Sequence, residues 1–396
     1  MTSHPLKVLK KLISGYKIVR NENLPGFVGG AVGYLGYDIV RLFKELPDEN
    51  PDDLGLPDAL FFFAHTFLLF DHLKHRIKIV SCAQVKRNPR EAYRNAIEKI
   101  EGLISQLRKP ARIKSKVQSP KSKVKIESNL TKDEFKRMVE KIKGYIKAKE
   151  VRQVIISQRL ETMINVPSFN IYRALRAINP SPYMFYLKCG NLRLIGASPE
   201  NLVKLEGRRV ITRPVASTRP RGKDAQGDGK MAQELFNNPK ERSEHLMLAH
   251  LCKKELEEVC ERNSIKMERE MEVERYSHVM HLVSTISGRL KKNKDAFSLI
   301  YTCFPSATIT GIPKKRAMGI IEEVESIKRG PYTGAIGTLS FSGDLDLGII
   351  VRSIIIKGKR TYIPVGCGIV AASIPEKEYQ ETRHKAQAQI EAIGTA

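Results

Sequence analysis

The sequence contains no tryptophan, no closely paired cysteines and no apolar run long enough to cross a bilayer. Its six cysteines form neither a CxxC pair nor a zinc-binding spacing, which disfavours a disulfide scaffold and indicates a reducing compartment. The longest apolar stretch, Leu60 to Phe70, is interrupted by His65 and Thr66 and is shorter than a membrane span. No apolar segment typical of a secretory signal follows the N-terminal lysines. We therefore expect a cytoplasmic protein with no membrane partner.

Acidic residues are scarce, because 43 Asp and Glu face 68 Lys and Arg and leave a formal net charge of +25. Such a surplus favours anionic partners, either nucleic acid or a small dianionic metabolite. No RNA- or DNA-binding motif accompanies the charge, so nucleic acid is the less favoured partner. A lysine-rich solvated surface with no particular partner is the plain alternative.

The chain divides into three predicted regions. Residues 1–107 contain strands punctuated by glycine and then a helix, and they form a partial N-terminal region. Residues 108–128 are basic and serine-rich, with two prolines, and are predicted to form a linker. Residues 129–396 start with a capping box at Thr131 and Glu134 and continue with many short strands. Because hairpin-linked strands outnumber helices, we expect an α+β fold.

Two pairs of glutamates are spaced three residues apart near predicted helix starts. Glu241 and Glu244 open one long helix, and Glu378 and Glu381 open the last helix. Residues i and i+3 share a helix face, so each pair presents two carboxylates together. If the pairs face each other, a cation must relieve their repulsion, and hard oxygen ligands suit Mg²⁺. The alternative is an ordinary acidic first turn, paired with neighbouring lysines and arginines.

A glycine motif, VGCGIVA from Val365, follows a predicted strand and precedes a helix, as a dinucleotide fingerprint does. The sequence ends at Ala396, without a second strand that could carry a ribose-binding acid, so we exclude a Rossmann site. Gly366 and Gly368 stay candidates for close backbone approach to a ligand, with a tight turn as the alternative. His281 lies among apolar residues, where a histidine is more often a hydrogen-bonded core residue than an acid or base.

An ordered series of motifs runs through the sequence: GFVGGAVGYLGYDIVR, NPSPYMFYL, IGASPENLVKLEGRRVITRPVASTRPRG, NPKERSEHLML, VERYSHVMHLVSTISGRL, FPSATITGIPKKRAMGIIEEVES, RGPYTGAIG and GCGIVAASIPEKEYQETRHKAQAQIEAI. Together these motifs resemble the chorismate-utilising enzyme family, which includes anthranilate, aminodeoxychorismate, isochorismate and salicylate synthases. The resemblance covers nearly the whole chain from about Leu24, apart from the linker.

The resemblance implies a fold and a set of site residues. The fold would be a large α+β sandwich of antiparallel sheets flanked by helices. In the family, the two glutamate pairs form the Mg²⁺ site that holds the ring carboxylate of chorismate; here they are Glu241, Glu244, Glu378 and Glu381. The family histidine that assists departure of the ring hydroxyl corresponds to His281, and a second catalytic residue to Glu200. The implied substrate contacts are Thr218, Thr308, Tyr332, Arg352, Gly366 and Gly368.

Two positions discriminate between activities within the family. Isochorismate and salicylate synthases use a lysine as the base for water where this chain has Gln153, and aminodeoxychorismate synthases carry a lysine where it has Ala216. Both differences favour ammonia as nucleophile, with anthranilate and pyruvate as products in tryptophan biosynthesis. No glutaminase domain is visible, so a separate glutamine amidotransferase subunit is the expected partner that supplies ammonia.

Among the positions that depart from the family pattern, four are singled out: Ser217 and Ala307 replace glycines, and His250 and Ala372 replace aspartates. A side chain added where backbone approaches a ligand can clash. The alternative functions are therefore a catalytically impaired paralogue that binds a partner, or an aminodeoxychorismate synthase. The family's tryptophan-inhibitor pocket combines the NPSPYM segment with a Leu-Leu-Glu-Ser motif that this sequence lacks, so we expect the sequence as printed to be insensitive to tryptophan.

Overall fold

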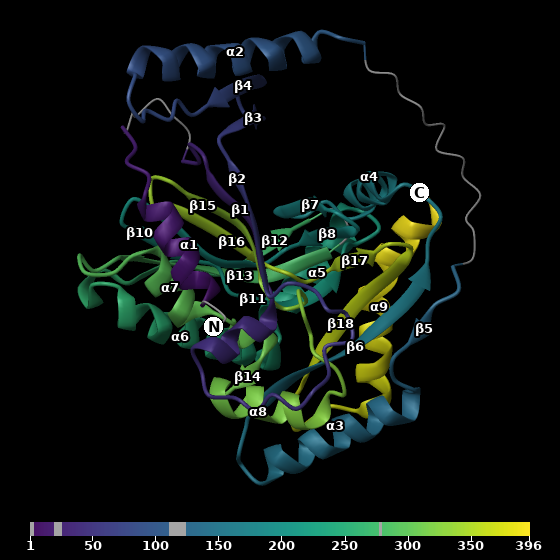
Figure 1. Ribbon diagram of the computed structural model, residues 1–396. Coiled ribbons are helices and arrows are strands. Elements are labelled where there is room, and N and C mark those ends of the chain that lie inside the picture. The colour runs from purple at the N-terminus through teal and green to yellow at the C-terminus, as the bar shows by residue number, and fades with distance from the viewer. Residues whose placement is uncertain (1–3, 20–25, 111–123, 277–278) are drawn as a thin grey trace.

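Two large antiparallel sheets form the body of the protein (Figure 1). The structure is a computed structural model that describes residues 4–19, 26–110, 124–276 and 279–396, without the side chains of residues 216–218. The nine-stranded sheet has the order β11-β13-β10-β9-β16-β15-β1-β2, and β12 pairs with β13. Its strands are β1 (Gly30–Leu35), β2 (Ala59–Ala64), β9 (Asn201–Glu206), β10 (Arg209–Thr212), β11 (Val215–Pro220), β12 (Lys266–Arg275), β13 (Val279–Arg289), β15 (Ala335–Ser340) and β16 (Leu345–Ile349).

The seven-stranded sheet has the order β14-β6-β18-β17-β8-β7, and β5 pairs with β6. Its central pair, β6 and β18, places Gly366 opposite Ser157 and Gly368 opposite Ile155. The short strand β5 lies at the end of the segment that the sequence predicts as a linker, so this end of the segment belongs to the sheet. The strands are β5 (Glu127–Ser128), β6 (Gln153–Met163), β7 (Tyr183–Cys189), β8 (Leu192–Ser198), β14 (Gly311–Ile312), β17 (Ser353–Lys357) and β18 (Arg360–Ile369).

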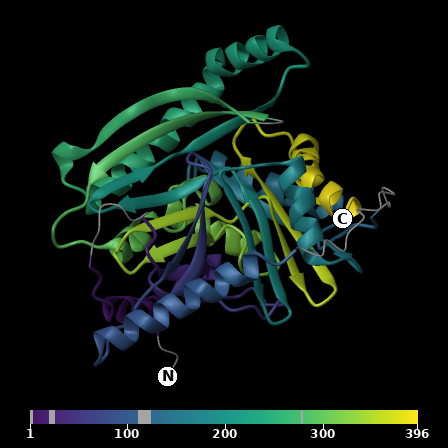
Figure 2. The ribbon, with the colours of Figure 1, turned by 90° about the horizontal axis from the view of Figure 1, so that it is seen from above.

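Helices cover the outer faces of both sheets (Figure 1; Figure 2). On the nine-stranded sheet, α6 packs against β13 and α7 against β9, while α5 lies beside β11 and β12. On the seven-stranded sheet, α9 lies along β18, α8 packs against β6, and α3 and α4 pack against α9. These helices are α3 (Lys132–Lys147), α4 (Ser168–Ile178), α5 (Ala225–Asn237), α6 (Pro239–Val259), α7 (Ala296–Cys303), α8 (Lys314–Val324) and α9 (Pro375–Gly394).

Local signals in the sequence explain several helix ends. The predicted capping box of α3 is confirmed, because the Glu134 backbone N–H donates to Thr131 Oγ1 and the Thr131 backbone N–H donates to the Glu134 carboxylate. The N-terminal helix α1 (Pro5–Ser14) has proline in its first turn and buries three apolar side chains against the nine-stranded sheet. The described residues also form the 3-10 turns η1 (Tyr37–Leu42), η2 (Arg262–Ser264) and η3 (Ala307–Ile309).

The inner faces of the two sheets meet in an apolar cluster. Tyr34 and Ile336 come from the nine-stranded sheet, and Leu194, Ile355 and Tyr362 come from the seven-stranded sheet. Each is at most 6% exposed, and full burial of a large apolar side chain contributes roughly 1.5–3 kcal/mol. The two sheets therefore form one sandwich with helices outside, which confirms the α+β class predicted from the sequence.

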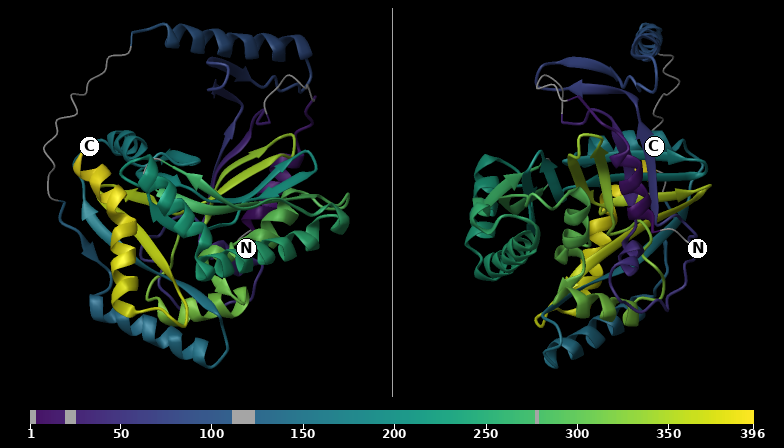
Figure 3. Two further views of the ribbon diagram at one scale, coloured as in Figure 1. Left: turned by 180° about the vertical axis from the view of Figure 1, so that it is seen from behind. Right: turned by 60° about the vertical axis from the view of Figure 1, so that its left-hand side comes forward.

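A smaller unit projects from one end of the body (Figure 3). Strands β3 (Thr66–Asp71) and β4 (Arg76–Ser81) form a separate two-stranded sheet, and α2 (Pro89–Leu107) packs against β4. The helix α2, described over its whole length, buries Ala96 alone, so this unit shares little core with the sandwich. Within the described ranges, no helix combines the length and apolar character that crossing a membrane requires.

Candidate functional site

The first glutamate pair opens α6. Asn238 caps this helix by accepting hydrogen bonds from two backbone N–H groups of the first turn. Gln153 Nε2 donates a hydrogen bond to Glu244 Oε1 at 3.0 Å, and Glu241 Oε1 lies 3.4 Å from Arg219 Nη2. The start of α6 therefore directs one carboxylate toward β6 of one sheet and the other toward β11 of the second sheet.

The second glutamate pair opens α9. The side chains of Ser373 and Cys367 are hydrogen-bonded to Glu378, and Cys367 lies on β18. Lys385 Nζ lies 2.7 Å from Glu381 Oε1, one helical turn farther along the same face. The start of α9 therefore places its carboxylates beside the central strand of the seven-stranded sheet.

Burial and mutual repulsion act on one glutamate of each pair. Burial raises the pKa of Glu244 and of Glu378, and the neighbouring Glu241 and Glu381, respectively, add repulsion. Glu381 of α9 also contributes to the repulsion at Glu244 of α6, so the two helix starts act on one another across the site. Carboxylates held in this way gain from a cation between them.

The four glutamates fit a magnesium ion in their chemistry, because Mg²⁺ prefers carboxylate oxygens and water. Their mutual repulsion is a second feature that a divalent cation would relieve. Their side chains are not gathered around one point, since the described part of the chain contains no cluster of three or more acidic, histidine or cysteine side chains with metal-binding geometry. Binding of the ion would therefore require side-chain rotation at these helix starts.

Gly366 and Gly368 lie on β18 where a larger residue would collide with its neighbours. A Cβ atom at Gly366 would lie 2.4 Å from the Ile156 carbonyl oxygen and 3.0 Å from the Tyr332 hydroxyl. A Cβ atom at Gly368 would lie 2.8 Å from Gln153 Nε2. Both glycines thus allow site side chains to approach the strand closely, as expected for positions where backbone borders a ligand.

The predicted contacts Tyr332 and Arg352 lie on turns with unusual backbone conformations. Thr333 and Arg352 have φ angles of 59° and 52°, in the left-handed region that L-residues seldom adopt. Tyr332 is 5% exposed, and burial raises its pKa, so its hydroxyl stays neutral. Burial lowers the pKa of Arg352, while the nearby Tyr332 and Glu381 oppose this effect. Strained backbone of this kind is concentrated at binding and catalytic sites.

Glu200 meets Thr308 in the interior. Glu200 follows β8 and is 9% exposed, and its carboxyl group is hydrogen-bonded to the Thr308 side chain. Burial raises the pKa of Glu200 from 4.5 to about 7, against the opposing effects of Thr308 and the positive charge of Lys385. A carboxyl group that titrates near neutral pH can both donate and accept a proton, as acid–base catalysis requires.

Lys385, which is not among the predicted site residues, connects several of them. Its Nζ donates to the Gly366 carbonyl oxygen at 3.1 Å and pairs with Glu381, and its charge acts on Glu200. Its own carbonyl oxygen accepts a hydrogen bond from Arg352 Nη1 at 2.7 Å. The signal was available, because Lys385 follows Glu381 by four residues and therefore shares its helix face.

His281 and Thr218 lie opposite each other on β13 and β11. His281 is 5% exposed, and its ring meets that of Tyr276 edge-on at a centroid distance of 5.6 Å. Arg219, which follows Thr218, pairs with Glu241, so this strand pair is connected to the start of α6. The Thr218 side chain lies outside the described residues, and its substrate contact stays a prediction.

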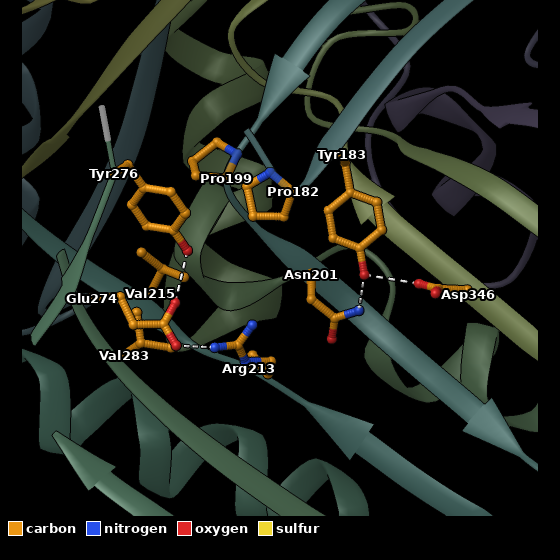
Figure 4. A pocket seen from close by; sticks show the side chains of 10 residues that line it. All are labelled: Pro182, Tyr183, Pro199, Asn201, Arg213, Val215, Glu274, Tyr276, Val283 and Asp346. Atoms are coloured by element: carbon orange, nitrogen blue, oxygen red, sulfur yellow. Dashed lines mark hydrogen bonds and ion pairs between the residues drawn. The ribbon is translucent and has the colours of Figure 1, made fainter. Parts of the chain in front are cut away.

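A cavity of about 180 Å³ adjoins this strand pair and has a polar wall on each side (Figure 4). On one wall, Tyr276 donates to Glu274 Oε2 at 2.7 Å, and Arg213 pairs with the same carboxylate. On the other wall, Asn201 Nδ2 donates to the Tyr183 hydroxyl at 2.6 Å. No local pattern in the sequence indicates this arrangement, because its members come from four segments that are far apart in the chain.

Three of the four departures from the family pattern have described side chains. Ala307 is 5% exposed at the start of η3, next to Thr308. His250 is exposed on α6, where its Nδ1 is hydrogen-bonded to a carbonyl oxygen one turn earlier, and Ala372 is exposed between β18 and α9. The side chain of Ser217 lies outside the described residues.

Known proteins match this chain over nearly its full length. The family described as chorismate binding enzyme matches residues 2–391. Anthranilate synthase component 1 of Acetivibrio thermocellus is 43% identical over 99% of this chain and 81% of that protein, and its counterpart in Aquifex aeolicus is 39% identical over 100% and 80%. The crystal structure of anthranilate synthase component I from Streptococcus pneumoniae superposes with a TM-score of 0.90 at 35% identity, over 98% of this chain and 86% of that one. The chain belongs to the chorismate-binding enzyme family.

Proposed function

We propose that the chain is the chorismate-converting component of an anthranilate synthase, which forms anthranilate and pyruvate in tryptophan biosynthesis. The observation that carries this proposal is the contact network of Lys385, which joins the predicted substrate contacts Arg352 and Gly366 to Glu200 and Glu381. The names of the similar proteins support it. The comparisons give no support to a catalytically impaired paralogue or to an aminodeoxychorismate synthase.

Positive groups and hydroxyls of this chain would hold the substrate dianion. Arg352 has the planar fork that suits the side-chain carboxylate of chorismate, and the neighbouring Tyr332 hydroxyl can donate to the same ligand. Glu241, Glu244, Glu378 and Glu381 would hold Mg²⁺, which supplies positive charge for the ring carboxylate when it is bound. Gly366 and Gly368 let the Tyr332 hydroxyl and the Gln153 side chain lie close against β18, where the ring would bind.

The proposed reaction balances without an external oxidant or reductant. Chorismate and ammonia give anthranilate, pyruvate and water: the ammonia nitrogen bonds to the ring as the hydroxyl departs, and loss of pyruvate then makes the ring aromatic. His281 donates the proton that turns the departing hydroxyl into water. Glu200, with a pKa of about 7, can exchange protons with the substrate at neutral pH.

The proposal includes a partner and a compartment. The word "component" in the names of the similar proteins implies a further subunit. A separate glutamine amidotransferase that delivers ammonia would fill this role. All six cysteines are free thiols in the structure, which agrees with a reducing, cytoplasmic location.

A direct assay tests the proposed function. Purified chain incubated with chorismate, an ammonium salt and Mg²⁺ should develop the fluorescence of anthranilate and release an equal amount of pyruvate. Reactions without ammonium or with a metal chelator are the controls, and both should stay dark. Isochorismate or aminodeoxychorismate as the sole product would overturn the proposal.

A further inference from the structure

A buried ion pair lies beneath the predicted substrate contacts. It has no role in the reaction proposed above. Arg329 and Glu325 follow α8, and their side chains are 2% and 5% exposed. Arg329 Nη2 donates to Glu325 Oε1 at 2.6 Å, and Nε donates to Oε2 at 2.9 Å, which makes the pair bidentate. Removing water from two charges costs free energy, so the pair is weak evidence for stability, and the groups that it holds in place are the feature to explain.

The remaining hydrogen bonds of the pair hold two other segments. Arg329 Nη2 also donates to the Ile155 carbonyl oxygen at 2.7 Å, and Nη1 donates to the Ile309 carbonyl oxygen at 3.0 Å. Glu325 Oε1 accepts from the backbone N–H and the hydroxyl of Ser157, at 2.8 and 2.9 Å. Ser157 is the β6 partner of Gly366, and Ile309 directly follows Thr308. The pair therefore fixes strand β6 and turn η3 relative to one another.

The same guanidinium supports the turn that presents Tyr332. Arg329 Nη1 lies 3.5 Å from Thr333 Oγ1, and the Thr333 hydroxyl donates to the Tyr332 carbonyl oxygen at 2.6 Å. Thr333 has a φ of 59°, which is unfavourable for a β-branched residue and persists only if its surroundings hold it. The Tyr332 backbone N–H donates to the Arg329 carbonyl oxygen at 3.2 Å, and the ring of Tyr37 lies 4.9 Å below the guanidinium.

We infer that Arg329 and Glu325 are positioning residues for chorismate binding, acting through Tyr332 and through the strand that carries Gly366. The inference rests on the proposed function, because it takes Tyr332 and Gly366 as substrate contacts. Neither charge contacts the substrate in this proposal, because the two side chains pair with one another and form their other hydrogen bonds with β6, η3 and the Thr333 hydroxyl. Their role is to hold the Tyr332 hydroxyl against β18, so their loss should weaken binding of chorismate and leave the use of ammonia unchanged.

The test compares Arg329→Lys and Glu325→Gln with a matched control, Arg41→Lys. Arg41 pairs with Glu322 at 2.5 Å and is also buried, at 12% and 6% exposure. Its other contacts are Asp38 within η1, and Asp48 and the Pro47 carbonyl oxygen in the loop that follows η1. We expect the two test variants to raise KM for chorismate on the order of tenfold, with KM for ammonia within about twofold of the parent chain. The control should lower the melting temperature by a similar amount without changing either KM.

Coupling to Tyr332 separates a positioning role from a merely structural one. In a Tyr332→Phe background, Arg329→Lys should raise KM for chorismate by no more than about threefold, because the group through which it acts has been removed. The inference would be overturned if Arg329→Lys raised KM for chorismate as much in the Tyr332→Phe background as in the parent chain. A parallel rise in KM for chorismate and KM for ammonia would overturn it as well.

Calorimetry of chorismate binding is measured together with the activity assay. It distinguishes failure of this inference from failure of the proposed function. If the parent chain binds chorismate but forms no anthranilate, the proposed function fails, and the dissociation constants of the variants still decide the role of Arg329. Unchanged binding in Arg329→Lys and Glu325→Gln would refute the inference while leaving the proposed function intact. If Arg329→Lys does not fold, the comparison is made with the milder variant Glu325→Gln alone.

Discussion

The two sides of the site differ in how completely their charges are balanced. On the acidic side, formed by Glu241, Glu244, Glu378 and Glu381, burial and repulsion raise the pKa of two carboxyl groups. On the substrate floor, formed by Tyr332, Arg352 and Gly366 above the Arg329–Glu325 pair, a bidentate ion pair and backbone hydrogen bonds balance the buried charges. The difference indicates that the floor keeps its geometry through its own contacts, whereas the acidic side would gain from a bound cation, as the proposed Mg²⁺ site requires.

The largest expected effect comes from breaking the acidic side. Glu244→Ala and Glu378→Ala each remove a carboxylate from the proposed ion site and also relieve local repulsion, so the protein should stay folded. Loss of several kcal/mol of charge stabilisation corresponds to a fall in Mg²⁺-dependent kcat/KM of about a hundredfold or more.

Glu376→Ala is the matched control for this experiment. Glu376 belongs to the same first turn of α9 but pairs with Lys132 and Lys136 on the surface. Its removal should leave turnover within about twofold, because exposed pairs contribute little. Parent-like turnover in both Glu244→Ala and Glu378→Ala would refute the assignment of the acidic side to Mg²⁺.

A second, smaller effect should follow from disturbing the floor. In Gly366→Ala, the added Cβ would lie 2.4 Å from a backbone oxygen of β6 and 3.0 Å from the Tyr332 hydroxyl, so strand and ring must separate. Overpacking of this kind costs roughly 1–3 kcal/mol, which predicts a fall in kcat/KM for chorismate of about tenfold. Gly229→Ala on α5, where a Cβ meets no atom within 4 Å, is the control. Full activity of Gly366→Ala would show that β18 does not border the substrate.

The pH dependence of stability should distinguish Glu200 from ordinary surface glutamates. Its pKa is raised to about 7 from 4.5 in the folded protein, so between these values the folded chain keeps a proton that the unfolded chain has lost. Stability therefore falls as pH rises through this window, and the loss is complete above about pH 7. Glu200→Gln carries no titrating group at this position, so its unfolding free energy should not fall in this window. Its difference in unfolding free energy from the parent chain should therefore increase by roughly 2 kcal/mol between pH 5 and pH 8. Thermal melts at several pH values measure the difference, and parallel curves would contradict the buried titration.

Local spacing predicted the acidic side better than the floor. The i, i+3 pairs follow from short stretches of sequence, and the structure places them at helix starts as expected. The glycine motif was also found from a short stretch, but Gly366 and Gly368 lie within β18 and not after it. The Arg329–Glu325 pair was not predicted, because its meaning lies in contacts with Ile155 and Ser157, which are 174 and 168 residues away in sequence. Likewise, the strand order that sets β1 beside β15 depends on the packing of the whole sandwich rather than on any local signal.

The smallest effect on activity is expected from restoring the family residues at the four positions that differ from the family pattern. His250→Asp and Ala372→Asp change exposed side chains, and Ala307→Gly removes a methyl group that is already accommodated in η3. Surface substitutions usually change stability by about 0.5 kcal/mol or less, and neither exposed residue belongs to the acidic side or the floor. With Ser217→Gly included, the fourfold revertant should therefore keep anthranilate formation within about threefold of the parent chain. The comparison needs steady-state rates at saturating chorismate, ammonium and Mg²⁺, together with melting temperatures to detect any change in folding. If activity appeared only in the revertant, the parent chain would be a binding protein that keeps the fold of an enzyme, and the balanced floor would be a feature of binding alone.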